Sequence, residues 1–163
     1  GRIDGCLCNV TSTEEVNEMI LKASDCLETI DVLVNNAGLG GQNSLEEMPD
    51  DVWNNIIDVT LNGTMRVMRA SIPYLKKTQG VIVNNASVLG WRAQKDQTHY
   101  AAAKAGVMAL TRCTAVELAE YNIRVNAVAP SLALNPHLSK TSSDELINTL
   151  INKEVLGLSL IHI

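Results

Sequence analysis

Short apolar runs alternate along this chain with longer stretches of helical periodicity, and this alternation constrains the fold more than any other feature. Parallel strands need connections of helix length between them, so the order predicts one α/β domain with a mainly parallel sheet. The predicted strands are residues 5–10, 31–36, 80–85 and 124–129. The predicted helices are residues 12–27, 46–76, 98–121 and 143–154.

Two of these helices carry further signals. Ser12 and Glu15 have the spacing of a capping box, which predicts that a helix starts there. The helix over residues 98–121 is Ala-rich and apolar on nearly every side, so both of its faces should be covered, and one cover could be a second subunit. The stripe expected to be buried on the first helix is Val16, Met19, Ile20, Ala23 and Leu27.

Composition excludes several classes of function. Apolar residues make up 46% of the 163 residues and charged residues 19%, as in soluble globular domains. The net charge of -5, without a Lys/Arg cluster, argues against nucleic acid or an anionic membrane as a partner. The sequence shows no membrane-length apolar run and no leader, so a reduced, cytoplasmic protein is expected. The cysteines Cys6, Cys8, Cys26 and Cys113 form no C-x-x-C pair, so we expect structural cysteines and no metal.

Tyr100 and Lys104 are four residues apart, which places a phenol and an ammonium on one face of a helix. A free tyrosine has a pKa near 10, and a nearby cation favours phenolate, which moves that pKa toward the range where acid-base catalysis works best. Such a pair also occurs by chance in exposed helices, so its context decides its meaning.

Two further motifs supply that context. Asn35-Asn36-Ala37-Gly38 closes the second predicted strand, and Ser87 follows the third, 13 residues before Tyr100. Each has a plainer interpretation, as a turn and as a helix cap. Together, over residues 5–157, the motifs N-N-A-G, Ser and Y-x-x-x-K resemble the short-chain dehydrogenase/reductase family, including its reductases of 3-oxoacyl thioesters.

The resemblance implies a Rossmann-type doubly wound parallel sheet and NAD or NADP as the cofactor. It implies that Tyr100 exchanges a proton with the substrate oxygen, that Ser87 hydrogen-bonds the same oxygen, and that Lys104 binds the nicotinamide ribose and lowers the Tyr100 pKa. Asn9 would accept a hydrogen bond from adenine. The implied cofactor-binding residues are Asn9, Val10, Asn36, Ala37, Gly38, Tyr100, Lys104, Pro130 and Ser131.

The sequence departs from the family pattern at two places near these motifs. Thr60 stands where the family has an asparagine that holds a proton-relay water, and Asn62 is turned about 200° away around the helix and cannot replace it. Thr60 remains a catalytic candidate. Ser131 replaces a glycine, and Asn135 stands in for a threonine that binds the carboxamide.

The family's Gly-rich phosphate turn occurs nowhere in the sequence. In the family order 3-2-1-4-5-6, the first two strands and the last strand are therefore expected to be missing. We expect residues 1–157 to be a partial Rossmann-like domain that does not bind cofactor alone. Residues 158–163 resemble a translated sequencing adapter and are interpreted as a non-native tail.

The family resemblance implies an NAD(P)-dependent oxidoreductase that interconverts a secondary alcohol and a ketone. Residues 130–155 border the substrate pocket in that family, and their apolar character suggests a hydrophobic substrate, such as a 3-oxoacyl thioester or a steroid-type ketone. The family also suggests a homodimer or homotetramer. Two alternatives stay open: a non-catalytic cofactor-binding or structural partner protein, and a fragment without function.

Overall fold

In the computed structural model, residues 3–133 and 144–152 are described. Three strands form a parallel sheet in the order β1-β2-β3, with Leu33 beside Ile82 and Ile82 beside Val125. The strands are β1 (Val32–Asn35), β2 (Val81–Asn85) and β3 (Arg124–Val128). The sheet and its parallel order confirm the predicted α/β class, and each strand lies within one of the predicted runs.

Helices connect these strands. The regular helices are α1 (Thr13–Leu27), α2 (Asp50–Ile57), α3 (Gly63–Thr78), α4 (Thr98–Leu118) and α6 (Asp144–Asn152). The short helical turns are the π-helical η1 (Asp58–Asn62) and the 3-10 turns η2 (Val88–Gly90) and η3 (Ala119–Tyr121). None of the helices in the described part is long and apolar enough to cross a membrane.

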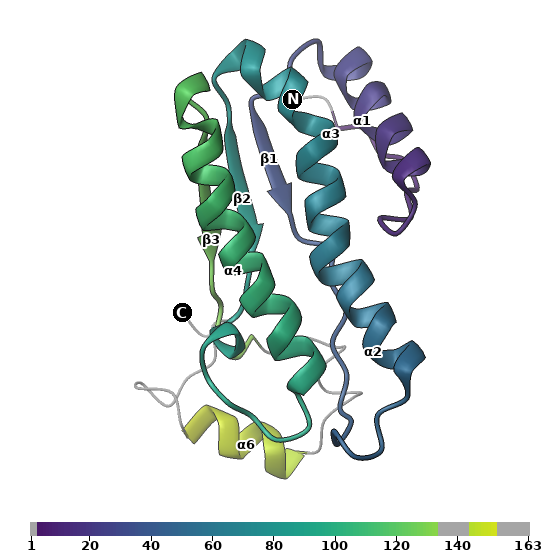
Figure 1. Ribbon diagram of the computed structural model, residues 1–163, viewed down its shortest axis with the longest axis vertical. Coiled ribbons are helices and arrows are strands. Elements are labelled where there is room, and N and C mark those ends of the chain that lie inside the picture. Colours follow the sequence, from purple (N-terminus) through teal and green to yellow (C-terminus); the bar gives the residue numbers. More distant parts are fainter. Residues whose placement is uncertain (1–2, 134–143, 153–163) are drawn as a thin grey trace.

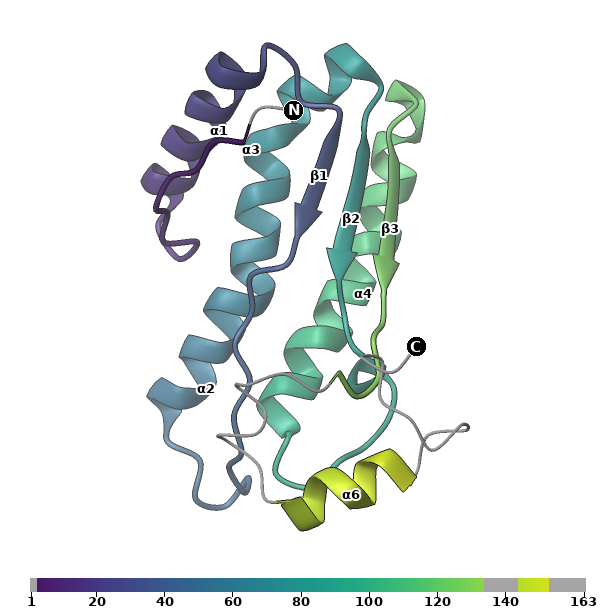
Figure 2. The ribbon, with the colours of Figure 1, turned by 180° about the vertical axis from the view of Figure 1, so that it is seen from behind.

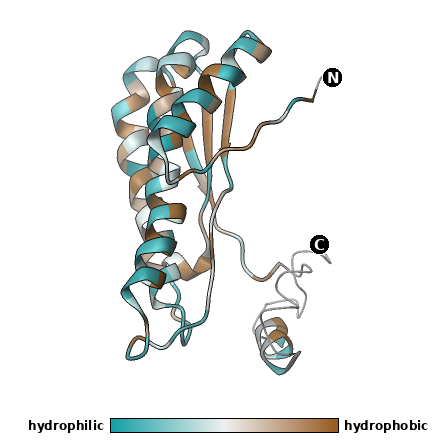
Figure 3. Ribbon diagram, turned by 90° about the vertical axis from the view of Figure 1, so that its right-hand side faces the viewer, coloured by the Kyte–Doolittle hydropathy of each residue, from teal (hydrophilic) through white to brown (hydrophobic). Residues whose placement is uncertain are grey.

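Among the described residues, the helices that pack on the sheet lie on one side of it. Helices α3 and α4 cover one face, and α1 packs on α3 (Figures 1 and 2). Ile82, at the centre of this face, is fully buried. The opposite face carries no described helix (Figure 3), and Val32 and Val34 of β1 are 59% and 62% exposed. The described residues therefore build one covered half of a doubly wound sheet.

The start of α1 follows its prediction. The Ser12 hydroxyl accepts a hydrogen bond from the Glu15 amide at 3.2 Å. The Glu15 carboxylate differs from a full capping box, because it accepts from the Asn9 amide at 2.8 Å rather than from Ser12. Val16 and Ile20 are buried as expected, but Leu27 is 53% exposed, because α1 ends there and nothing described lies over its last turn.

The prediction of a strand over residues 5–10 is wrong. This segment belongs to no sheet, and Leu7 is fully exposed. Strand propensity reflects packing against neighbouring strands, and no described strand lies beside it. Its attachment is at Val10, whose carbonyl accepts from Arg66 at 3.3 Å and whose side chain packs on Gly63 so closely that a Cβ there would lie 2.8 Å away.

The continuous helix predicted over residues 46–76 is also wrong in detail. Pro49 is the N-cap of α2 rather than a residue inside the helix, so residues 46–49 are not helical. The π-helical turn η1 then separates α2 from α3 and contains Thr60. Such π-bulges insert an extra residue into a helix and occur often at functional sites. The helix predicted over residues 98–121 is confirmed as α4 and η3.

The remaining predictions concern the last helix, the four cysteines and the C-terminal residues. The helix predicted over residues 143–154 is confirmed as α6, on which Ile147 is buried. Of the four cysteines, Cys6, Cys26 and Cys113 are exposed, and Cys8 is partly buried against the hydrophobic core. Residues 158–163 lie outside the described residues.

Candidate active site

The carboxyl ends of the three strands bring the predicted motifs together. Asn36 follows β1, Ser87 follows β2 and Pro130 follows β3. Hydrogen bonds join these ends: the Val88 amide donates to the Pro130 carbonyl at 3.1 Å, and the Asn85 side chain donates to the Asn36 side chain at 2.7 Å. In open parallel sheets, ligands bind beyond this edge.

Helix α4 places Tyr100 and Lys104 at the same edge. The Lys104 ammonium lies 5.6 Å from the centre of the Tyr100 ring and donates to the Asn85 carbonyl at 2.6 Å. Ser87 is buried at the start of η2, where its hydroxyl accepts from the Leu89 amide at 3.2 Å, and its side chain lies close enough to Tyr100 to lower the pKa of that phenol. Three residues predicted from separate motifs therefore meet in one cluster.

The electrostatics of this cluster differ from the prediction. Burial raises the pKa of Tyr100 above its ordinary value, and the hydrogen bond with Ser87 acts in the opposite direction. Burial lowers the pKa of Lys104 to about 8. The expected lowering of the Tyr100 pKa by Lys104 is not found, because both groups are desolvated and the ammonium is bonded to a carbonyl. With its pKa raised, the Tyr100 phenol is protonated at neutral pH.

Thr60 holds the turn that follows the N-N-A-G motif. Its hydroxyl accepts from the Leu39 amide at 3.1 Å and donates to the Leu39 carbonyl at 3.3 Å, and the residue is 1% exposed. A Cβ at Gly38 would lie 3.6 Å from the Lys104 ammonium and 3.7 Å from the Thr60 side chain. Thr60 is therefore beside the cluster, with its hydroxyl engaged by the backbone. Asn62 donates instead to Asp58 at 2.9 Å.

The other predicted cofactor residues are less uniform. Ala37 and Gly38 are exposed at the end of β1, and Pro130 and Ser131 are half-buried at the end of β3. The Asn9 side-chain oxygen accepts from both the amide and the hydroxyl of Thr11, at 3.1 and 2.9 Å, so it must release one of them to accept from adenine. Asn135 lies outside the described residues.

Sequence reasoning missed a buried polar network beneath these residues. The Asn35 amide donates to Asn84 at 2.8 Å, and Asn84, which is fully buried, donates to Thr111 of α4 at 2.9 Å. It also missed Asn85, whose carbonyl binds Lys104 and whose buried side-chain oxygen has no partner among the described residues. An available signal was the pair of asparagines at the end of an otherwise β-branched run.

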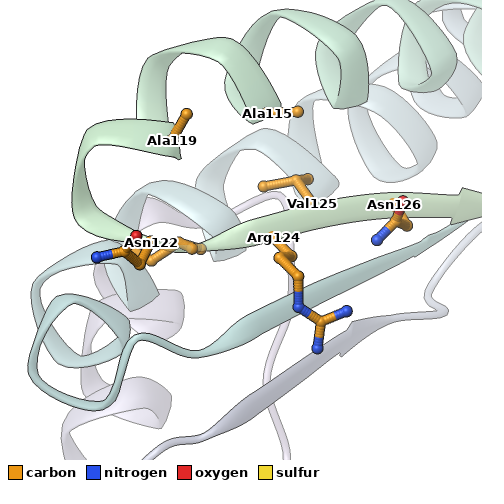
Figure 4. Close-up of a pocket in the computed structure, with 7 residues that line it drawn as sticks. Ala115, Ala119, Asn122, Arg124, Val125 and Asn126 are labelled. Carbon is orange, nitrogen blue, oxygen red and sulfur yellow. The ribbon is translucent and has the colours of Figure 1, made fainter.

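A hollow among the described residues lies away from this cluster. It measures about 540 Å³ and opens between the end of α4 and the first residues of β3 (Figure 4). Ala115, Ala119, Asn122, Ile123, Arg124, Val125 and Asn126 line it. Because this is the amino end of β3, it is remote from the edge where parallel sheets bind ligands.

The fold and the cluster define a Rossmann-type α/β protein with a Ser-Tyr-Lys site at the carboxyl edge of its sheet. The chain belongs to the short chain dehydrogenase family, whose model matches residues 1–146. This finding confirms the family resemblance that the motifs indicated.

Several relatives are similar over most of this chain. It is 53% identical over 159 residues to a (5R,7aS)-5-hydroxy-7a-methyl-1-oxo-2,3,5,6,7,7a-hexahydro-1H-indene-carboxyl-CoA reductase of Mycobacterium tuberculosis, covering 96% of this chain and 61% of the relative. It is 42% identical over 141 residues to the 3-oxoacyl-[acyl-carrier-protein] reductase FabG of Thermotoga maritima, covering 86% and 57%. The chain thus spans about three fifths of the length of these relatives.

Solved structures agree with the fold. A crystal structure of a short chain dehydrogenase from Mycobacterium smegmatis is 55% identical with a TM-score of 0.78, covering 82% of this chain and 55% of the other. Carveol dehydrogenase from Mycobacterium avium in complex with NAD is 34% identical with a TM-score of 0.80, covering 84% and 50%.

Proposed function

We propose that this protein is an NAD(P)-dependent oxidoreductase that interconverts a secondary alcohol and a ketone. The observation that carries the proposal is the convergence of Ser87, Tyr100 and Lys104 at the carboxyl edge of the sheet. The reductase names of its relatives support the same class of reaction.

In the proposed reaction, Tyr100 donates its phenolic proton to the substrate oxygen, and in the reverse direction it takes the proton of the hydroxyl. The raised pKa of Tyr100 keeps this proton in place for the reduction. Ser87, which lies beside Tyr100, donates a hydrogen bond to the same substrate oxygen. When bound, a nicotinamide cofactor supplies the hydride to the carbonyl carbon or accepts it from the alcohol.

The residues at the strand ends fit the nicotinamide end of NAD or NADP. Lys104 has three N–H donors, and the Asn85 carbonyl takes one of them, which leaves two for ribose hydroxyls. Asn36, Ala37 and Gly38 are exposed beside it, and Gly38 leaves space next to the ammonium. Val10, Pro130 and Ser131 are further proposed contacts. The sequence contains no Gly-rich turn for the pyrophosphate, so the fit concerns this end alone.

We assign Thr60 a supporting part in this site. Because its hydroxyl is bonded to both polar backbone groups of Leu39, it positions the turn beside Lys104. A water that relays protons to Lys104 would have to be bound by another residue. Thr60→Asn tests this assignment. A large gain in rate would show that the reaction needs an asparagine amide at this position more than the hydrogen bonds between Thr60 and Leu39.

The substrate we propose is a hydrophobic ketone or its alcohol, of the 3-oxoacyl thioester or fused-ring type. The names of two relatives, a fused-ring carboxyl-CoA reductase and a 3-oxoacyl carrier-protein reductase, support both types. Rates with a 3-oxoacyl-CoA and with a fused bicyclic ketone, measured in parallel, would separate them.

We also propose a cytoplasmic homodimer or homotetramer that binds neither nucleic acid nor membranes. Val116 of α4 is 79% exposed on an apolar helix, which a second subunit could cover. The net charge of -5 disfavours anionic partners. Sedimentation analysis showing only monomer would contradict the assembly.

The decisive experiment is Tyr100→Phe, with Tyr121→Phe as the matched control. Tyr121 is in η3, where its ring lies 3.4 Å from the Lys76 ammonium, away from the site. We expect Tyr100→Phe to lower kcat about a thousandfold, because removal of a general acid typically costs 10²–10⁴ in rate, and Tyr121→Phe to leave it unchanged. The readout is NAD(P)H absorbance with a 3-oxoacyl-CoA.

A non-catalytic cofactor-binding or structural partner protein is the alternative. It would be favoured if the unaltered protein bound NADH or NADPH, as measured by nucleotide fluorescence, yet turned over no ketone or alcohol. Because residues 1–157 alone are not expected to bind cofactor, both measurements use the full-length protein, in which failure of both binding and turnover would reject both functions.

A further inference from the structure

His99, the residue directly before Tyr100, is a buried group that the proposed mechanism does not use. It is fully buried, and neither of its ring nitrogens has a hydrogen-bond partner among the described residues. A buried polar group without a partner is rare in native proteins, because it loses its hydration and gains nothing in return. Its position therefore calls for a physical explanation.

The His99 ring fills the space between helix α2 and the turn of residues 38–43, which we call the glycine turn. A Cβ at Gly41 would lie 3.3 Å from His99 Nε2 and 3.5 Å from the Ile56 side chain of α2. No side chain at residue 41 fits without pressing on the imidazole. The backbone of Gly41 thus rests directly on His99.

The same turn contacts the proposed acid. A Cβ at Gly40 would lie 3.9 Å from the Tyr100 ring. Two hydrogen bonds tether the turn to the start of α4: the Gln97 side chain donates to the Gly41 carbonyl at 2.6 Å, and the Asn43 amide donates to the Asp96 carbonyl at 3.1 Å. The turn is therefore held at Leu39, Gly41 and Asn43 by hydrogen bonds, and it packs on Tyr100 at Gly40 and on His99 at Gly41.

Burial lowers the pKa of His99, while the backbone of Gln97 acts weakly in the opposite direction. The ring is therefore neutral at pH 7. No carboxylate bonds to it among the described residues, and Glu47 bonds with Ser44 while Asp58 bonds with Arg66. The ionisable groups on the elements packed around it are Glu46 and Glu47 of the preceding loop, Asp50, Asp51 and Asp58 of α2 and η1, and Asp96, Tyr100 and Lys104 at the start of α4.

We propose that His99 is a positioning residue, whose neutral ring holds the glycine turn against Tyr100 and whose protonation in mild acid releases that turn. An imidazolium has two N–H donors, and neither ring nitrogen of His99 has an acceptor among the described residues. A buried charge without partners is costly, so protonation favours movement of the segment that rests on the ring, which is the glycine turn at Gly41. The catalytic consequence of this movement rests on the function proposed above.

The direct test follows the Gly40 and Gly41 amides and the His99 ring by NMR in the whole chain as the pH is lowered from 8 to 5. We expect both amides to shift with the His99 titration, at a midpoint below the ordinary histidine value of about 6.5. His99→Gln should abolish that shift, and His99→Phe gives a second non-titrating variant if the first does not fold. Amides that ignore the His99 titration, or that still titrate in these variants, would overturn the proposal.

Gln97→Leu is the matched control, because it removes the other support of the glycine turn and leaves the imidazole in place. It should loosen the turn at every pH but keep the dependence on His99. If Gln97→Leu abolished the pH response as His99→Gln does, the response would belong to the tether, and the proposal would fail.

Steady-state kinetics separate this proposal from the function. We expect His99→Gln to lower kcat about tenfold with little change in KM, since small misplacements of a reacting group cost up to about a hundredfold, and to remove the loss of kcat in mild acid. A wild-type kcat–pH profile in His99→Gln would reject the positioning role and leave the function standing. If His99 and the amides titrate together in a protein without turnover, the positioning role would stand and the proposed function would be rejected.

Discussion

The two faces of the sheet in this protein differ in how far their side chains are buried. On the covered face, Ile82 and Asn84 of β2 are fully buried beneath α3 and α4. On the open face, Val32 and Val34 of β1 are more than half exposed. The residues of the proposed site are attached to the covered half, through α4 and the ends of the strands. The comparison shows that a site can be organised by one packed layer of a doubly wound sheet.

The largest effect on stability should come from a pair of variants on opposite faces. Ile82→Ala removes a fully buried side chain, and we expect a loss of about 2–4 kcal/mol in the free energy of unfolding. Val34→Ala, at 62% exposure, should cost less than about 0.5 kcal/mol. Urea unfolding of both variants is the measurement. Equal losses would mean that the open face is packed in solution.

Lys104 gives a pH-dependent test of the covered half. Its pKa is lowered from 10.5 to about 8 in the folded chain, so between these values the unfolded chain binds more protons. Stability should therefore rise with pH from about 8 to 10.5, by at most roughly 3 kcal/mol. Unfolding curves across this range should show the rise, and Lys104→Met should remove it. A rise that persists in Lys104→Met would assign it to another group.

A smaller loss is expected from the polar network under the sheet. Asn84→Leu leaves the Asn35 amide without its partner and the Thr111 hydroxyl with only its bond to the Val107 carbonyl, which should cost about 1–3 kcal/mol. Asn126→Leu, on the exposed edge strand β3, is the control and should change little. If Asn84→Leu left the free energy of unfolding unchanged in chemical denaturation, water would be replacing the lost hydrogen bonds.

The smallest effect concerns a surface helix end. Ser12→Ala removes the side-chain cap of α1 and should cost about 1 kcal/mol in the same unfolding assay. Ser24→Ala, in the last turn of α1, removes a hydroxyl that bonds only within its own helix and should cost less. The reverse order would show that the start of α1 is already frayed.

Much of this architecture was readable from local patterns. The runs containing β1, β2 and β3, the start of α1 and the whole of α4 followed from apolar periodicity and capping residues. So did the meeting of Ser87, Tyr100 and Lys104, since the carboxyl ends of parallel strands share one edge. The strand expected over residues 5–10 failed, because a strand needs a partner that a local pattern does not provide.

The sequence by itself determined the class of fold and the order of the motifs, because helical and strand periodicities are local and follow from side-chain geometry. Tertiary structure alone decided the rest. It set the π-helical turn that aims Thr60 at Leu39, the raised pKa of Tyr100 and the burial of His99 under the glycine turn. These depend on which distant segments exclude water from one another, and desolvation is a property of the packed chain rather than of any one stretch of it.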